Sequence, residues 1–272
     1  MYHRSQLQQR LAGTGRMLVL MQDSSSVSEM MRELGFVMNT KENIDCVGLQ
    51  GARVVEIACY NSPNNTVVCG SSTTISKLQR MLKESGKAQG KLIPGDIAFH
   101  SSLMQPIRGD LLDVLHSLHG SKTRKCQVPM VSTVSGLVIK EISAAYWWDN
   151  VRRPVALSKA METVQKVVNP KVLLELSPHI TLRSPIRDNY TDSSCKMPKY
   201  IHTLIRQEDD SVCFARCIGD CFKAAVSMNF RAMFPRPKPI TNYLPRYSMR
   251  EERVIDYLID IRSFLKEETF SS

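Results

Sequence analysis

A histidine stands at the tip of a short apolar run in DIAFHSSLMQP, residues 96–106. Ile97, Ala98 and Phe99 have the composition of a buried strand end, and His100 follows them directly. A neutral imidazole takes the proton of a serine or cysteine during nucleophilic catalysis, and two serines come next in the chain. The run therefore suggests a catalytic base at His100, with a structural histidine as the alternative.

The cysteines are a second group that could carry chemistry, and no two of them form a C-x-x-C pair. Cys213, Cys217 and Cys221 are four residues apart, so they share one face of a helix. Metal sites use tighter spacing or nearby histidines, whereas a free cysteine packs as a small hydrophobe. We interpret the three as a buried helix face rather than a metal site, and the cysteines as reduced thiols of a cytoplasmic protein.

Composition and charge narrow the class of protein. The 272 residues are 43% hydrophobic and 23% charged, as in soluble globular proteins. No apolar stretch approaches the roughly 18 residues that span a bilayer, and residues 1–13 lack the apolar core of a secretory signal. The net charge of +10 suits an anionic partner such as coenzyme A or an acidic carrier protein. No zinc-finger, RRM or helix-turn-helix pattern accompanies that charge, so we expect no nucleic acid and no membrane as partner.

The elements that position these residues begin with a regular alternation over residues 16–95. Apolar runs with strand character and helices with serine caps and glycine stops follow one another in the order β-α-β-β-α-β. That order is typical of a ferredoxin-like unit. The predicted elements are strands at 16–21, 53–61, 65–70 and 90–95 and helices at 24–36 and 71–86, with a surface insertion at 39–52.

Longer elements follow residue 96. The spacing of apolar residues predicts a helix over 102–120, a buried strand over 128–136, a helix after Pro154 and a parallel-type strand over 171–178. The proline-rich piece 234–247 is typical of a linker, and an amphipathic helix follows it. Residues 1–13 have leucines at helical spacing without a cap, so we expect a helix that continues from upstream.

Six short motifs occur in one order along the chain: HRS (3–5), GRMLVL (15–20), NSPNNTVVCG (61–70), IAFHSSLM (97–104), YWWDNVRRPV (146–155) and LELSPHITL (174–182). Together they resemble the malonyl/acyltransferase domain of type I fatty acid and polyketide synthases, of animal-like type, over about residues 2–190. The resemblance implies an α/β fold: part of an α/β-hydrolase-like acyltransferase core with an inserted ferredoxin-like subdomain.

The implied domain organisation has five parts. They are a remnant helix of the large subdomain (1–15), the ferredoxin-like small subdomain (16–95), the remainder of the large subdomain (96–190), a post-acyltransferase linker region (191–250) and a C-terminal amphipathic helix (251–272).

In that family a serine in a G-H-S-x-G elbow accepts the acyl group, and the histidine of A-F-H-S is its base. The resemblance places the base at His100 and assigns the main chain of Ala156 to orient its ring. G-H-S-x-G does not occur in this sequence, and Ser101 and Ser102 are not on a strand-to-helix elbow that would expose a nucleophile. We therefore expect the serine to lie upstream of Met1 and this chain alone to be inactive.

The resemblance also implies three substrate-binding residues. Arg4 matches the arginine that binds the malonyl carboxylate, for which a guanidinium fork is well suited. Phe99 resembles the malonyl-selecting pattern before the histidine, because its ring would crowd an added methyl group. Ile97 departs from the usual residue two places before Phe99. The third residue is Asn61 in the NSP motif.

The implied activity is transfer of a malonyl-type group from coenzyme A to an acyl carrier protein, with no metal and no cofactor beyond the carrier's phosphopantetheine. Other domains of a multidomain synthase are the expected partners. The alternative is a non-catalytic acyl-CoA or carrier-protein binding module, or a degenerate acyltransferase. We expect the first because His100 and Arg4 are both retained.

Overall fold

The computed structural model describes residues 2–39, 53–119, 123–191 and 193–233. The chain divides into two compact units, Met1–Val226 and Ser227–Ser272. In the second unit the described residues form one short helix, α9 (Phe230–Met233). The other described helices and strands belong to the first unit.

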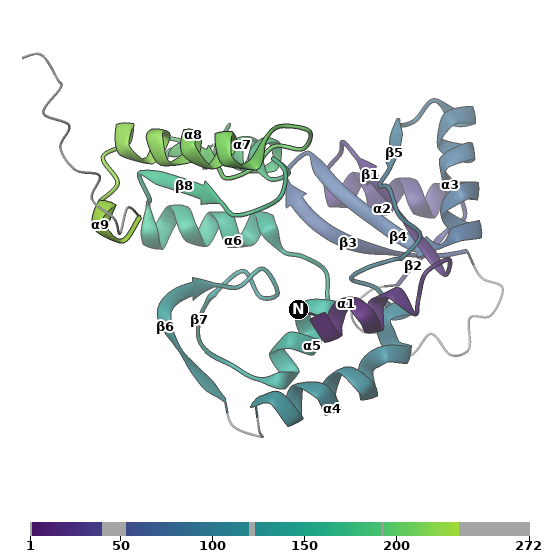
Figure 1. The fold of residues 1–272 in the computed structure, drawn as a ribbon. Coiled ribbons are helices and arrows are strands. Elements are labelled where there is room, and N and C mark those ends of the chain that lie inside the picture. The colour runs from purple at the N-terminus through teal and green to yellow at the C-terminus, as the bar shows by residue number, and fades with distance from the viewer. Residues whose placement is uncertain (1, 40–52, 120–122, 192, 234–272) are drawn as a thin grey trace, which may run out of the picture. The chain divides into compact units, whose positions relative to one another are not determined.

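A five-stranded sheet forms the first half of this unit, with strand order β2-β3-β4-β1-β5 (Figure 1). Its strands are β1 (Gly15–Leu20), β2 (Val37–Met38), β3 (Val54–Ser62), β4 (Asn65–Ser71) and β5 (Gly90–Leu92). β4 pairs antiparallel with β3 on one side and with β1 on the other, and β1 pairs antiparallel with β5. The two-residue β2 pairs parallel with β3. The expected ferredoxin-like order is confirmed.

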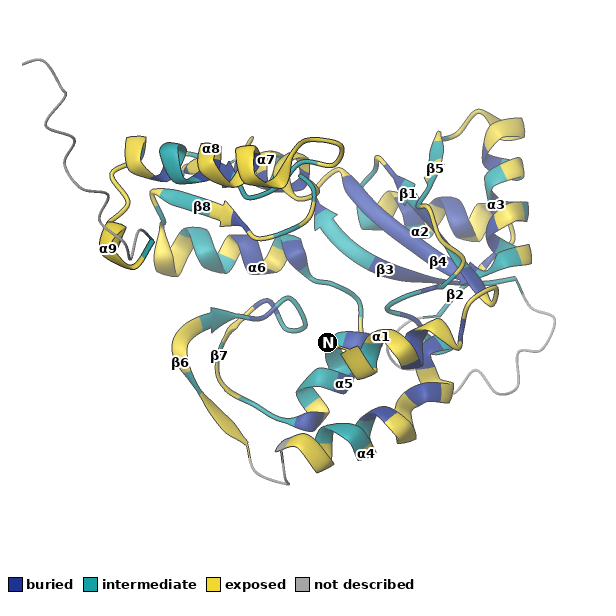
Figure 2. Ribbon diagram, viewed as in Figure 1, coloured by how far each residue is buried: buried dark blue, intermediate teal, exposed yellow. Residues whose placement is uncertain are grey.

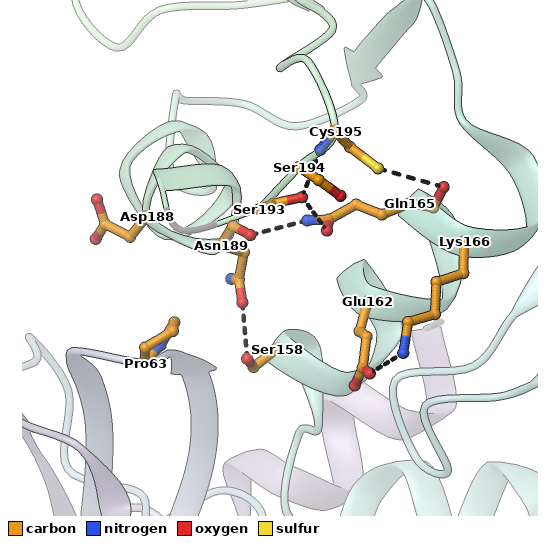
Figure 3. Close-up of a pocket in the computed structure, with 10 residues that line it drawn as sticks. All are labelled: Pro63, Ser158, Glu162, Gln165, Lys166, Asp188, Asn189, Ser193, Ser194 and Cys195. Atoms are coloured by element: carbon orange, nitrogen blue, oxygen red, sulfur yellow. Dashed lines mark hydrogen bonds and ion pairs between the residues drawn. The ribbon is translucent and has the colours of Figure 1, made fainter.

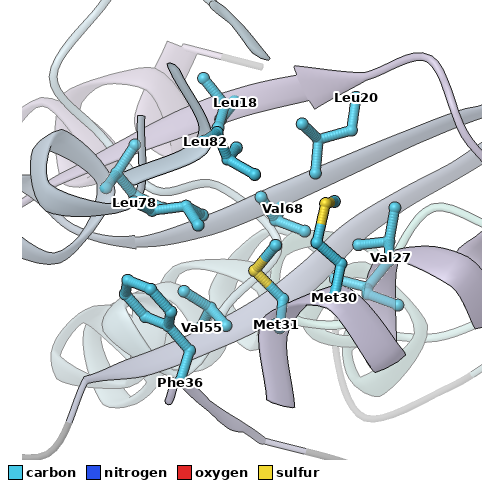
Figure 4. Packing of buried hydrophobic residues seen from close by; sticks show 12 residues of the cluster. Leu18, Leu20, Val27, Met30, Met31, Phe36, Val55, Val68, Leu78 and Leu82 are labelled. Carbon is cyan, nitrogen blue, oxygen red and sulfur yellow. The ribbon is translucent and has the colours of Figure 1, made fainter. Parts of the chain in front are cut away.

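Helices α2 (Ser24–Glu33) and α3 (Ser72–Ser85) cover one face of this sheet. Asp23 rather than a serine caps α2, since its carboxylate accepts from the backbone N–H groups of Ser25 and Ser26. Gly86, with φ 65°, ends α3 in the left-handed conformation that glycine adopts without strain. The apolar core between helices and sheet (Figure 4) consists of Leu18, Leu20, Val27, Met30, Met31, Phe36, Val55, Ile57, Val68, Ile75, Leu78 and Leu82.

The opposite face of the sheet receives the segment that leads to His100. Strand alternation turns Val55 and Ile57 into the helix-covered core, so Glu56 and Ala58 face the other way. A second buried cluster on that face consists of Met17, Ala58, Val67, Cys69 and Ala98, with Phe99 and Leu103 packed against it. The segment lies very close to β1, because a Cβ built on Gly15 would be 2.5 Å from the Cβ of Ala98.

Four helical elements surround the turn after His100. They are α1 (Tyr2–Gln9), η2 (Ser102–Ile107, a 3-10 helix), α4 (Arg108–His119) and α5 (Ala144–Arg152). Their buried faces (Figure 2) meet in a third cluster of Leu7, Leu11, Met104, Ile107, Leu111, Trp148 and Val151. The helix expected over 102–120 is thus a 3-10 turn containing Pro106 that continues as an α-helix.

The strand expected to be buried over 128–136 is different. It forms β6 (Arg124–Val131), which pairs only with β7 (Val138–Ile142) in a separate two-stranded sheet. Most of β6 is exposed, and Val128 is 73% exposed. The prediction of burial was wrong, because the apolar residues of β6 lie on a hairpin with which no other described strand pairs.

The remaining elements of the unit include a short pair of parallel strands. A parallel-type strand was expected over residues 171–178. They are α6 (Leu157–Thr163), a π-helical turn η3 (Val164–Val168), β8 (Val172–Glu175), α7 (Arg183–Thr191), β9 (Lys199–His202) and α8 (Asp210–Lys223). β9 and α8 lie in the stretch expected as a linker region, yet β9 pairs with β8. Cys213, Cys217 and Cys221 are the buried residues of α8, which confirms their interpretation as a packed face.

The surface insertion from residue 40 onward, the proline-rich linker and the C-terminal amphipathic helix lie outside the described residues. Among the described residues, no helix is both long enough and apolar enough to cross a bilayer.

The close approach of Gly15 to Ala98 predicts that adding one methyl group at position 15 lowers the free energy of unfolding. Gly15→Ala forces the segment before His100 away from β1, and overpacking of this kind costs about 1–3 kcal/mol. Urea unfolding followed by circular dichroism measures the loss. The control is Gly109→Ala, where the added Cβ meets nothing within 4 Å and alanine should stabilise α4 by about 0.5–1 kcal/mol. Equal stability of parent and Gly15→Ala would contradict the close approach.

Candidate functional site

His100 lies at the junction of the two halves of the first unit, in an unusual backbone conformation. Its φ of 60° places a residue with a Cβ in the left-handed region, which costs energy unless its surroundings hold it. On its N-terminal side Ala98 is fully buried, and on its C-terminal side Ser101 is fully buried. The imidazole itself is half-buried. A strained residue between two buried ones fits a functional position.

Both serines after His100 have other partners. The hydroxyl of Ser101 donates to the carbonyl of Ala98 (2.6 Å) and accepts from the backbone N–H of Leu103, so it caps η2. The hydroxyl and the backbone N–H of Ser102 both donate to Glu56 Oε1. These bonds agree with the expectation that neither serine is the nucleophile.

The ring of His100 is oriented by a main-chain carbonyl. Its Nδ1 lies 3.1 Å from the carbonyl oxygen of Arg153. Because a carbonyl only accepts, Nδ1 carries the proton and Nε2 keeps its lone pair. Pro154 makes this carbonyl available: it lacks an N–H and disfavours helical geometry at Arg153, which is extended with ψ 154°.

The assignment of this role to Ala156 was therefore wrong by three residues. The N–H of Ala156 donates to the carbonyl of Thr133 (2.6 Å), and its carbonyl accepts from Ala160 at the start of α6. Between the two positions, Val155 bridges to β3, exchanging backbone hydrogen bonds of 2.8 Å with Ala58 and Tyr60. That bridge fixes the chain that carries the Arg153 carbonyl.

Arg4 is held on α1 by two side-chain hydrogen bonds. Its Nη1 donates to Asn150 Oδ1 (2.8 Å) and its Nε to Gln8 Oε1 (3.3 Å). The side chain of Gln8 is buried and Asn150 lies in α5. Burial lowers the pKa of Arg4 from its ordinary value, although a guanidinium stays charged at neutral pH. Arg4 thus bonds α5 and His100 bonds Arg153, the residue directly after it, so both are held at the same helix end.

Electrostatics keep the imidazole of His100 neutral. Burial lowers its pKa, the hydrogen bond to Arg153 opposes this by raising it, and the positive charge of Arg4 lowers it further. The result is a pKa below the ordinary histidine value. A neutral imidazole with a protonated Nδ1 presents a basic Nε2 at pH 7, which is the state that a general base requires.

Phe99 is next to His100 and is partly buried between two apolar clusters. Asn61 lies at the end of β3, where its Nδ2 donates to Asn65 Oδ1 and its carbonyl accepts from Asn189 Nδ2 (2.7 Å). Its contacts therefore differ from those of His100 and Arg4. The substrate-binding role expected of Asn61 stays a prediction.

A pocket near the β3–β4 hairpin, shown in Figure 3, explains where Asn189 points. Polar side chains of α6, α7 and the segment after it face its interior, and many of them bond one another, as Asn189 does with Ser158. The site residues expected from the sequence do not line it. Its lining consists of Pro63, Ser158, Glu162, Gln165, Lys166, Asp188, Asn189, Ser193, Ser194 and Cys195.

Three residues that contact the site were missed in the sequence. They are Glu56, which accepts from Ser102; Asn150, which accepts from Arg4; and Arg152, which donates to Glu56. A usable signal was present at Glu56, a charge inside the apolar strand VVEIA, because a buried charge requires a partner. Among the described residues, no group of three or more His, Cys, Asp or Glu side chains is arranged to hold a metal ion.

Comparison with known proteins decides the family. Residues 1–227 match the acyl transferase domain family. The chain belongs to that family. This acyltransferase chain is 26% identical over 279 aligned residues to probable polyketide synthase 1 of Dictyostelium discoideum, an alignment that covers 92% of the chain and 8% of that relative. It is thus an acyltransferase domain sequence of the polyketide synthase type that spans a small part of a much longer relative.

Two solved structures show the same fold as the acyltransferase chain. The acyltransferase domain from the second module of the salinomycin polyketide synthase matches with a TM-score of 0.70 at 21% identity, covering 90% of this chain and 52% of that one. The malonyl CoA-acyl carrier protein transacylase from Clostridium perfringens matches with a TM-score of 0.60 at 20% identity, covering 82% and 63%. The expected α/β acyltransferase fold is confirmed.

The electrostatic coupling of Arg4 to His100 predicts a directional change in titration. Arg4→Gln removes a positive charge that disfavours protonation, so the pKa of His100 should rise, from a value that lies below 6.5 in the parent. Proton NMR titration of the imidazole in the 272-residue chain measures it. Arg10→Gln is the control, since Arg10 is exposed and pairs with Asp110. A pKa of His100 that is the same in parent and Arg4→Gln would show that the two groups are not coupled.

Proposed function

We propose that this chain supplies the general base and the carboxylate-binding arginine of an acyltransferase. The reaction moves a malonyl-type group from coenzyme A to an acyl carrier protein through a serine carried by a segment outside this sequence. The observation that carries the proposal is the pairing of a neutral, carbonyl-oriented His100 with the charged Arg4. The malonyl CoA-acyl carrier protein transacylase among the similar structures supports the substrate class.

The chemistry follows from the two side chains. Nε2 of His100 takes the serine proton as the serine oxygen attacks the thioester carbonyl, and the imidazolium returns that proton to the departing coenzyme A thiolate. In the second half, the carrier's phosphopantetheine thiol gives its proton to Nε2 and attacks the serine ester. The serine oxygen then recovers the proton. The Arg153 carbonyl stabilises the imidazolium in both halves.

Arg4 supplies the charge that a malonyl carboxylate needs. A carboxylate taken out of water without a partner costs several kcal/mol, so a fixed cation must accompany it. The bonds of Arg4 to Asn150 and Gln8 use Nη1 and Nε, and among the bonds between described residues none uses Nη2. Nη2 and the second N–H of Nη1 can therefore hold the carboxylate as a fork. Phe99 beside His100 favours malonyl over bulkier groups.

The expected setting follows from the same proposal. The carrier protein and the other domains of a synthase would be its partners, and no metal or bound cofactor takes part in the steps above. Each cysteine in the described part of the chain, such as Cys59 and Cys69, is a free thiol, which fits the reducing cytoplasm.

Replacing His100 tests the function directly. Joined to the G-H-S-x-G-bearing segment of a family member, the chain should transfer radiolabelled malonyl from malonyl-CoA to a carrier protein. His100→Ala should slow that transfer about 10²–10⁴-fold, the usual contribution of a general base. His116→Ala, at an exposed position of α4, should leave the rate unchanged. Transfer by His100→Ala within about tenfold of the parent would refute the base assignment, and binding of malonyl-CoA without transfer would favour a non-catalytic module.

Replacing Arg4 tests the carboxylate site. Arg4→Ala in the joined domain should lower kcat/KM for malonyl relative to acetyl by about 10- to 100-fold, because a hydrogen bond to a charged group contributes about 1.5–3 kcal/mol. Arg4→Lys should restore part of the ratio, since it keeps the charge and loses the fork. Arg10→Ala, directly after the end of α1, is the control. A malonyl-to-acetyl ratio that Arg4→Ala leaves unchanged would place selectivity elsewhere.

A further inference from the structure

Glu56 is a buried charge that the proposed mechanism does not use. It is the third residue of β3, is 7% exposed, and projects from the sheet face on which the His100 segment packs. Its neighbours in the strand, Val55 and Ile57, belong to the apolar core on the other face. A carboxylate at such a position is unfavourable unless its oxygens are all used.

The two carboxylate oxygens bond two segments that lie far apart in the sequence. Oε1 accepts from the backbone N–H of Ser102 (2.8 Å) and from its hydroxyl. Oε2 accepts from Arg152 Nη1 at 3.2 Å, an ion pair whose side chains are only 14% and 10% exposed. Ser102 is two residues after His100, and Arg152 is one residue before the carbonyl that orients it.

We propose that Glu56 is a positioning residue that holds the His100 ring against the Arg153 carbonyl and so fixes the tautomer in which Nε2 is the base. This inference rests on the proposed function, because it gives Glu56 its part in base catalysis. Glu56 does not touch the reacting atoms. It acts through Ser102 on one side and Arg152 on the other.

The backbone conformation of His100 explains why the bonds of Glu56 to Ser102 and Arg152 are needed. A left-handed conformation at a residue with a Cβ relaxes unless both sides are anchored. Ser101 anchors the near side by its bonds to Ala98 and Leu103, and these bonds are local. Glu56 adds to the apolar packing of η2 against α5 a direct link between Ser102 and Arg152, through charge-assisted bonds that are stronger than neutral ones.

In the described part of the chain, few charged and titratable groups surround the Glu56 carboxylate and its bonds to Ser102 and Arg152. Arg152 and the Cys69 thiol face Glu56, and burial together with the Glu56 charge raises the pKa of Cys69. Arg4 is the charge that acts on His100. Since Arg152 neutralises Glu56 at close range, the effect on His100 is expected through geometry rather than through charge.

The tautomer of His100 is the direct readout. In the 272-residue chain, two-bond ¹H–¹⁵N spectra of the histidine rings, recorded well above the imidazole pKa, should show Nδ1 of His100 protonated, with its resonances identified by their loss in His100→Asn. Glu56→Gln should move the Nδ1 and Nε2 shifts of His100 toward each other, as the ring exchanges between tautomers. The matched control is Glu175→Gln, a carboxylate that is also 7% exposed but bonds Thr181, Leu182 and Tyr200 instead. It should leave the His100 resonances in place.

A second variant separates position from stability. Glu56→Gln leaves Arg152 buried without its counter-ion and could unfold the chain, whereas Glu56→Gln combined with Arg152→Met removes both charges, a change that buried ion pairs often tolerate. The double variant should fold, by circular dichroism, and still show the averaged tautomer of His100. Glu56→Asp should restore the parent shifts in part.

Unchanged His100 shifts in a folded Glu56→Gln or double variant would overturn the inference, whatever the transfer activity. A second outcome is that Glu56→Gln changes the tautomer of His100 while the parent chain, joined to the serine-bearing segment, transfers no malonyl. That pair of results would uphold the positioning role and reject the proposed function. The two failures are therefore distinguishable.

Discussion

The end of α5 is the constraint on which the site depends. Pro154 stops the helix after Arg152, so the last residues of this helix have groups that no further helical turn can satisfy. The site uses this helix end in three ways: the backbone carbonyl of Arg153 holds His100, the Asn150 side chain holds Arg4, and the Arg152 side chain holds Glu56. Residues from α1, β3 and the 96–102 segment are thereby fixed to one short stretch.

The two faces of the ferredoxin-like sheet serve different ends. Alternation along β1, β3 and β4 gives one face to α2 and α3, whose apolar core stabilises the subdomain. The other face carries Glu56 and the cluster under Ala98, so the same strands form the floor of the site. The close approach at Gly15 and the bridge of Val155 to β3 attach the second half of the unit to that floor.

Local patterns and the family resemblance predicted much of this and missed what depends on geometry. The alternation over 16–95 predicted the β-α-β-β-α-β order, since each run satisfies its own periodicity. His100 and Arg4 came from motifs, and the structure brings them together. The orienting carbonyl was placed at Ala156 because a motif does not show where a helix ends. β6 was expected to be buried because an apolar run does not show whether a partner covers it, and Glu56 was missed because its partners are distant in the sequence.

The charges around His100 are arranged so that one cation dominates. An aspartate in place of the Arg153 carbonyl would raise the pKa of His100 and would offset the charge of Arg4. A carbonyl fixes the tautomer without a net charge, and the Glu56 carboxylate is paired with Arg152. The charge that acts on His100 is that of Arg4, which adds to burial, the larger cause, in lowering the pKa of His100. In the proposed function a single arginine thus binds the substrate carboxylate and also helps to lower the pKa of the base, and this coupling requires that other charges near the ring be paired.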